Sequence, residues 1–187
     1  MDFKEAMGDN LSGSLLIAHP SLVDPNFKHS VVLVSADSPE DGTLGVVINK
    51  PIGKTLGEQS IDFAIGTLAD VPIYMGGPVQ TDQILLAAWH WQPEVGIFRM
   101  HFGISEDKAK ELIEIEPATQ VRAFMGYSGW GKGQLNHERE QNAWLISPVS
   151  DPSIQEVDGD DMWREMISKI QPELLFLSDV PDDPSLN

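Results

Sequence analysis

The chain has no cysteine, few basic side chains and no long hydrophobic run, and each absence excludes a class of protein. Without cysteine among its 187 residues, the protein has neither disulfides nor thiolate metal sites, as is common in a reducing cytoplasm. Lys and Arg number only 12 against 29 Asp and Glu, which gives a formal net charge of −17. Because basic side chains supply most of the affinity for nucleic-acid phosphates, we expect no direct binding to nucleic acid.

The hydrophobic runs are too short for a membrane-spanning helix. The longest of them, Ile84–Trp89, has six residues, whereas a transmembrane helix needs roughly 20. The first residues, from Met1 to Glu5, have neither the basic nor the apolar part of a secretory signal. These features predict a cytoplasmic protein that does not enter a membrane.

The length of the chain predicts one domain. A chain of 187 residues is of ordinary size for a domain with its own hydrophobic core, and no stretch resembles a linker between domains. We therefore expect a single domain over residues 1–187. Acids are concentrated after Asp151, and residues 178–187 form an acidic, proline-containing tail that we expect to be frayed.

Short apolar runs bounded by glycine, proline or aspartate predict β-strands. The runs Leu15–Ala18, Val31–Val34 and Leu44–Ile48 are continuous rather than alternating, which is typical of strands that are buried on both faces. The Asp41-Gly42 dipeptide between two of them predicts a hairpin turn. The expected strands are Leu15–Ala18, Val31–Val34, Leu44–Ile48, Pro72–Met75, Ile84–Trp91, Val121–Met125 and Trp144–Ile146.

Helical spacing of apolar residues predicts four helices, over residues 3–11, 106–116, 134–141 and in the segment after Asp160. Ser105 is the expected N-cap of the second helix, and Pro117 ends it. Asp160 or Asp161 is the expected cap of the last helix, whose apolar face would be Trp163, Met166, Ile167 and Ile170. Strand–strand and strand–helix–strand connections both occur in this order. We therefore expect an α/β fold with α+β character, in which helices pack outside a mixed sheet.

Residues 126–135 read G-Y-S-G-W-G-K-G-Q-L, and we call them the glycine motif. We expect a loop here between a strand and a helix. The segment Gly126–Lys132 matches the G-x-x-x-x-G-K of a phosphate-binding loop, but Gly133 lacks the hydroxyl that would bind magnesium. Weaker anion binding by the N–H groups at the start of the following helix stays open.

Ser128 lies in a near match to the G-x-S-x-G nucleophile turn, but Trp130 occupies a position that requires a small residue. No histidine has a suggestive spacing to an acid that would activate the serine. The alternative is a structural turn in which Tyr127 and Trp130 fill the core. Nearby, His137-Glu138 begins a zinc-binding H-E-x-x-H pattern, but Gln141 replaces the second histidine. We expect no metal site and no cofactor.

Three polar blocks mark a candidate ligand or partner site. Asn49 and Lys50 follow an apolar strand, where functional residues often lie in open α/β sheets, although an ordinary strand end would look the same. Gly76-Gly77 forms a tight turn. Gln134 and Glu138 lie on one face of a helix, although an ordinary solvent-exposed helix face would also be polar. The candidate site residues are Asn49, Lys50, Gly76, Gly77, Tyr127, Trp130, Gln134 and Glu138.

Six sequence blocks follow one another along the chain: G-S-L-L-I-A-x-P (13–20), D-P-x-F-x-x-S-V-V (24–32), G-x-x-G-V-V-I-N-K-P (42–51), G-G-P-V (76–79), the glycine motif, and E-x-x-x-N-A-W-L (138–145). With these blocks in this order, the chain resembles the AlgH/YqgE family of bacterial proteins. The resemblance implies a single-domain α/β fold whose strongly bent sheet forms a pseudo-barrel. It implies no established enzymatic activity.

Some positions depart from the family pattern. Ser128 stands where alanine is common, and Lys132 lies at a variable position. Residues 80–83 replace an arginine-bearing stretch, and the usual G-H-A ending is absent. The favoured function is that of a non-catalytic interaction protein or an indirect regulator of transcription. The alternative is an enzyme that binds a small molecule, nucleotide or phosphate through the Gly126–Gly133 loop, and direct DNA binding ranks third.

Overall fold

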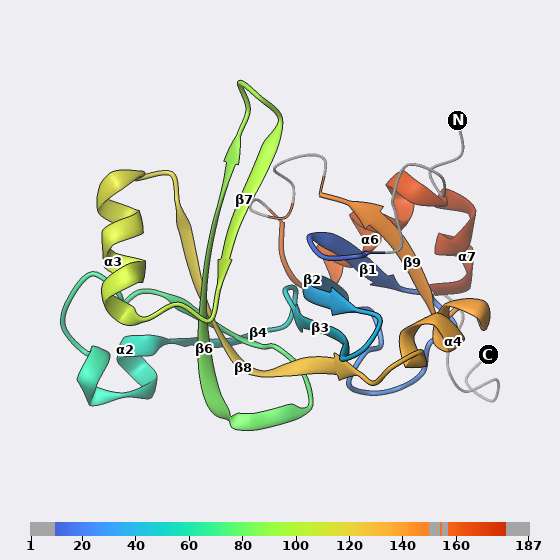
Figure 1. Ribbon diagram of the computed structural model, residues 1–187, viewed down its shortest axis with the longest axis horizontal. Helices are drawn as coiled ribbons and strands as arrows, with labels where there is room; N and C mark the ends of the chain where they lie inside the picture. The colour runs from blue at the N-terminus through green and yellow to red at the C-terminus, as the bar shows by residue number, and fades with distance from the viewer. Residues whose placement is uncertain (1–9, 150–153, 155–156, 179–187) are drawn as a thin grey trace.

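The computed structural model describes residues 10–149, 154 and 157–178 (Figure 1). The predicted N-terminal helix lies almost entirely outside the described residues, as do residues 179–187 of the predicted frayed tail. The strands are β1 (Ser14–Ala18), β2 (Val31–Ser38), β3 (Gly42–Val47), β4 (Pro51–Thr55), β5 (Pro72–Met75), β6 (Val79–Gln92), β7 (Ile97–Phe102), β8 (Gln120–Trp130) and β9 (Trp144–Pro148). The helices are α2 (Leu56–Gln59), η1 (Ile61–Phe63), α3 (Glu106–Ile115), α4 (Gln134–Glu140), α6 (Gly159–Ile170), η2 (Pro172–Leu174) and α7 (Leu175–Ser178).

The strands form one mixed sheet in the order β4-β5-β8-β3-β2-β1-β9, with β6 paired to β8 and β7 to β6. The long strand β8 joins its two parts. The first half of β8 pairs in parallel with β5 and antiparallel with β6, and its last three residues pair with β3. The outer strands β4, β7 and β9 do not pair with one another within the described residues, so the sheet is not closed. This confirms the predicted mixed α/β fold class.

Helices cover the two parts of the sheet separately. Helix α3 packs against β6 and β8 at one end of the molecule, whereas α6 packs against β1 at the other (Figure 1). The predicted apolar face of α6 is confirmed for Trp163, Met166 and Ile167, which are buried together with Met162, while Ile170 is partly exposed near the end of the helix. Between the two ends, the hairpin of β6 and β7 projects from the body of the protein (Figure 1).

Every strand predicted from the sequence is present, but two strands have no apolar run to reveal them. Strand β4 contains Gly53 and Lys54, and in β7 half-buried residues alternate with the exposed Arg99 and His101. The prediction for the cap of α6 was wrong by two residues or more. Asp158 has the extended N-cap conformation and its carboxylate accepts from the N–H of Gly159, so Asp160 and Asp161 lie in the first turn, where the helix dipole favours acids.

Candidate functional site

The glycine motif is mainly a strand, which corrects the prediction of a loop over residues 126–133. Residues 126–130 continue β8, and residues 128–130 pair with β3, with Gly129 opposite Leu44. Only residues 131–133 form the turn before α4. A side chain on Gly77, in the β5–β6 connection, would overlap the backbone of Tyr127. The glycines therefore let two backbone segments approach closely, which is a packing role.

Ser128 lies where β8 passes close to the β5–β6 connection at Gly76 and Gly77. It is fully buried, and its Oγ donates to the carbonyl oxygen of Gly76 at 3.0 Å. The same oxygen accepts from the N–H of Val47, and the N–H of Gly76 donates to Met125, both at 2.9 Å. The serine hydroxyl therefore links β8 to Gly76, and it is not presented to solvent as a nucleophile would be.

Glu138 links two tryptophans that lie far from each other in the sheet order. Its Oε2 accepts from the indole N–H of Trp130 at 2.9 Å and from that of Trp144 at 2.8 Å. Its Oε1 accepts from Gln134 at 3.0 Å, and the side chain of Gln134 in turn accepts from the N–H of Gly131. Phe27 stacks on Trp130 and meets Trp144 edge to face, which completes the aromatic cluster. Glu138 therefore faces inward from α4 and links β8 to β9.

We expect Glu138→Ala to lower the free energy of unfolding by about 2 kcal/mol, because two largely buried indole N–H groups lose their acceptor. Glu138→Gln should cost roughly half as much, since one acceptor oxygen remains. Glu140→Ala is the matched control, because Glu140 is exposed on the same helix and should change stability by less than about 0.5 kcal/mol. Denaturant unfolding followed by tryptophan fluorescence measures all three; equal stability of the two alanine variants would contradict the prediction.

Asn49 and Lys50 also make internal contacts. Asn49 is only 2% exposed; its Oδ1 accepts from the N–H of Val31, and its Nδ2 donates to the carbonyl oxygens of His29 and Gly159. Lys50 donates to the carbonyl oxygen of Asn26 at 2.9 Å. Partial burial lowers the pKa of Lys50, while Asp160 and Asp24 oppose this shift. Asn49 therefore links β2, β3 and α6.

The structure brings only part of the predicted site together. The N–H of Met75 donates to the carbonyl oxygen of Lys50, and the Gly76-Gly77 turn lies on Tyr127 and Ser128. These residues are neighbours in the sheet. Asn49 donates to the carbonyl oxygen of Gly159 at the start of α6, whereas Glu138 accepts from Trp130 at the C-terminal end of β8, and Gln134 donates to Glu138. These polar side chains form hydrogen bonds within the protein and do not line a common pocket.

Strand β8 also contains a buried arginine that the sequence analysis did not single out. Arg122 is 5% exposed and donates to the carbonyl oxygens of Ile48 at 2.9 Å and Ile154 at 3.2 Å. Its guanidinium carbon lies 4.6 Å from the ring centroid of Tyr74 and 4.9 Å from that of Trp89. Burial lowers the pKa of Arg122, while Tyr74 and Asp158 oppose the shift. The available signal was one arginine in the apolar strand Val121–Met125.

Because the pKa of Tyr74 is raised in the folded protein, we expect the free energy of unfolding to fall at alkaline pH. Burial raises its pKa to about 12; Arg122 opposes this shift, and the hydrogen bond to Asp158 at 2.6 Å adds to it. A tyrosine in the unfolded chain ionises near pH 10. The stabilising effect is therefore complete below about pH 10 and is lost as the pH rises to about 12.

The chain has only two tyrosines, so the titration is readily followed. Tyrosinate absorbance should show one component that ionises near pH 12, and this component should be absent from Tyr74→Phe. Unfolding curves measured over the same pH range should show the fall in stability for the natural chain and a smaller fall for the variant. Loss of the late component from Tyr127→Phe instead would contradict the assignment.

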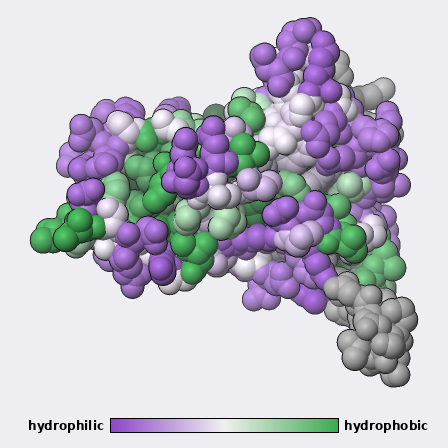
Figure 2. Space-filling view, turned by 90° about the horizontal axis from the view of Figure 1, so that it is seen from below, coloured by the Kyte–Doolittle hydropathy of each residue, from purple (hydrophilic) through white to green (hydrophobic). Residues whose placement is uncertain are grey.

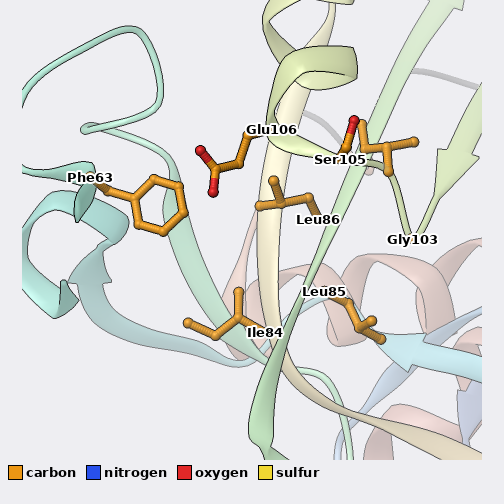
Figure 3. Close-up of a pocket in the computed structure, with 8 residues that line it drawn as sticks. Phe63, Ile84, Leu85, Leu86, Gly103, Ser105 and Glu106 are labelled. Carbon is orange, nitrogen blue, oxygen red and sulfur yellow. The ribbon is translucent and has the colours of Figure 1, made fainter.

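An open pocket of about 500 Å³ lies between η1, β6 and the start of α3, away from the residues predicted from sequence (Figure 3). Apolar side chains form most of its wall. The carboxylate of Glu106 points toward the space between Phe63 and Leu86 (Figure 3). The residues that line the pocket are Phe63, Ile84, Leu85, Leu86, Gly103, Ile104, Ser105 and Glu106.

The start of α3 is fixed by Ser105, as the sequence predicted. The Ser105 Oγ accepts from the N–H of Lys108 at 3.2 Å, which caps the helix and directs Glu106 to the pocket. One Glu106 oxygen lies 4.0 Å from the Nζ of Lys110, a weak and exposed pair. The carboxylate remains open to a ligand in the pocket.

Exposed apolar residues line the pocket or flank one of its lining residues in the sequence. Ile61 and Ile65, on either side of Phe63 in the chain, are 89% and 94% exposed, and Ile84 is 38% exposed. Figure 2 shows hydrophobic surface gathered at the left end, where α2 and α3 lie. Single exposed apolar residues are normal, but a group beside an apolar pocket is typical of an interaction site.

A comparison with protein-family models shows where the chain belongs. A model described as AlgH-like matches residues 15–175. The chain belongs to the AlgH-like family. A UPF0301 protein of Streptomyces coelicolor is 35% identical, with 95% of this chain and 96% of the relative covered. A UPF0301 protein of Thermobifida fusca is 32% identical over the same shares of the two chains.

Solved structures support the AlgH-like fold. The crystal structure of protein DIP2367 from Corynebacterium diphtheriae has a TM-score of 0.69 at 23% identity, covering 94% of this chain and 96% of that one. The solution structure of the AlgH protein from Pseudomonas aeruginosa has a TM-score of 0.64 at 26% identity, covering 95% and 97%. In this AlgH-like chain, Glu138 joins Trp130 of one resemblance block to Trp144 of another. These side chains of the shared sequence pattern therefore have a structural role.

The described part of this AlgH-like chain contains no group of three or more histidines and acids able to hold a metal ion. Within the same residues, no helix has both the length and the apolar character needed to cross a membrane. The structure does not identify a catalytic group in the pocket, where Glu106 is the one ionisable side chain.

Proposed function

We propose that this chain is a non-catalytic cytoplasmic interaction protein that binds its partner through the pocket between η1, β6 and α3. The observation that carries the proposal is the opening lined by Phe63, Ile84 and Leu86 beside the exposed Ile61 and Ile65. Burial of such side chains by a partner is favourable at roughly 25 cal/mol per Å² of apolar surface. An effect on transcription would then be indirect, since the net charge of −17 opposes contact with DNA.

The alternative function, an enzyme that binds a small molecule, nucleotide or phosphate through the Gly126–Gly133 loop, has weaker support. The N–H of Gly131 already donates to the side chain of Gln134, and Lys132 pairs with Glu40 at 3.2 Å. Helix α4 has only seven residues. These groups would have to exchange their present partners before they could surround a phosphate.

Two matched variants test the proposal. Ile84→Ser removes apolar surface from the pocket, whereas Ile97→Ser changes an isoleucine of similar exposure, 47% against 38%, on β7. In quantitative affinity purification with the full chain as bait, we expect a reproducible partner that Ile84→Ser loses and Ile97→Ser retains. Partners that both variants retain equally would contradict this use of the pocket.

A ligand panel tests the alternative. A ligand at 100 times its Kd should stabilise the folded chain by about 2.7 kcal/mol, and a thermal shift assay would detect this. We expect no shift with ATP, GTP or inorganic phosphate. A shift that is abolished by Lys132→Ala would favour the phosphate-binding alternative over the proposal.

A further inference from the structure

We propose that the partner of this pocket is a basic amphipathic segment of another protein, with an apolar side chain in the pocket and a lysine or arginine against Glu106. This inference rests on the proposed function and names the chemistry of the partner. The wall of the pocket is mostly apolar and has one carboxylate, that of Glu106. A ligand that complements it therefore carries an apolar group and a positive charge close together.

Charge at this end of the molecule supports a cationic partner. The two segments that form it, residues 51–86 and 103–119, contain nine acids against three bases. Asp62, Glu106 and Asp107 are exposed next to the pocket in sequence or structure. Two of the bases already lie near acids of their own helix, since Lys108 pairs with Glu111 and Lys110 lies near Glu106. The surrounding field therefore attracts a basic segment and repels an acidic one.

The shape of the pocket supports an amphipathic rather than a uniformly charged segment. Phe63, Ile84 and Leu86 come from two different elements and face one space, with Glu106 above them (Figure 3). A partner helix places apolar residues three or four positions apart on one face. One such residue fills the pocket, while a neighbouring apolar residue covers Ile61 or Ile65, which are almost fully exposed.

Two synthetic helical peptides with the same leucine positions, one with lysine and one with glutamate at the polar positions, test the inference on the full chain. Isothermal calorimetry should show binding of the lysine peptide that weakens as salt is raised, and at least tenfold weaker binding of the glutamate peptide, about 1.4 kcal/mol. Amide shifts in NMR spectra should move around Phe63, Ile84 and Glu106.

The control variants separate this inference from the proposed function. Glu106→Gln should weaken the lysine peptide about threefold, and Asp107→Asn should weaken it less. Asp107 is the matched control because it is an exposed acid in the same first turn of α3 and does not line the pocket. Ile84→Ser should weaken the lysine peptide, whereas Ile97→Ser should not.

Each outcome has one meaning. If Ile84→Ser weakens both peptides equally and Glu106→Gln changes neither, the pocket binds apolar segments and only the basic partner is wrong. If Ile84→Ser has no more effect than Ile97→Ser on either peptide, the proposed function fails as well. If Glu106→Gln and Asp107→Asn act alike, attraction is non-specific and the assigned contact is overturned.

Discussion

Replacing Gly77 with alanine is expected to lower the free energy of unfolding by about 4 kcal/mol, because no small movement makes room for the added carbon. The Cβ would overlap the carbonyl group of Tyr127 and lie 2.5 Å from the nitrogen of Ser128. Both are backbone atoms of β8, so the sheet itself would have to separate. The φ of Gly77 is 152°, which alanine also disfavours.

The control for this prediction is Gly131→Ala. At Gly131 the nearest atom to an added Cβ is a Gln134 oxygen at 3.9 Å, an ordinary contact. We expect a change of less than about 0.5 kcal/mol. Chemical denaturation of both variants provides the comparison, and a Gly77→Ala protein as stable as Gly131→Ala would show that the β5–β6 connection does not need this close approach.

Replacing Arg122 with alanine is expected to cost about 4 kcal/mol of stability, because hydrogen bonds to a charged group and the volume of a large buried side chain are lost together. The carbonyl oxygens of Ile48 and Ile154 lose a donor, and the rings of Tyr74 and Trp89 lose the group between them. The indole nitrogen of Trp89 already has no hydrogen-bond partner among the described residues. Loss of the arginine side chain would thus leave a cavity next to Trp89, in a core that already contains one polar atom without a hydrogen bond to any described residue.

Arg122→Met separates volume from charge. Methionine fills most of the space and requires no desolvation of a cation, so we expect about half of the loss measured for alanine. Arg99→Ala is the surface control, because Arg99 is exposed on β7 and donates only to Gln92 among the contacts described. Urea unfolding at neutral pH is the measurement. Equal losses for Arg122→Ala and Arg99→Ala would show that the buried guanidinium contributes little.

Strand prediction succeeded where the chain has continuous apolar runs and failed where it does not. The runs at β1 and at the first four residues of β2 are buried on both faces, so their composition alone revealed them. Strand β4 is mostly exposed and contains no apolar run, and it exists because its partner β5 supplies hydrogen bonds. The glycine motif predicts a loop for residues 126–130 of β8, because glycine usually interrupts strands; in the structure, glycine allows the neighbouring backbone to approach.

The candidate site shows the same division. Ser105 was predicted correctly as a helix cap because capping is a local interaction between residues three apart. The start of this helix lies beside Phe63 of η1 and Ile84 of β6 only in the folded protein. These segments are distant in the sequence, so no local sequence pattern predicts that they are neighbours. Glu138 and Gln134 were predicted to share a helix face, and they do, but the face is directed at Trp130 and Trp144 rather than at a ligand.

By itself, the sequence determined the acidity of the protein, the absence of disulfides, most of the strands and the AlgH-like family, because composition, local periodicity and ordered motifs are properties of the chain. Only the tertiary structure decided what the glycine motif does and where an opening lies. Burial and contact depend on residues distant in sequence: Gly76 meets Ser128, Glu138 meets two tryptophans, and Glu106 faces Phe63. The side chains with the most suggestive pattern are used inside the protein, while an unremarkable helix start borders its pocket.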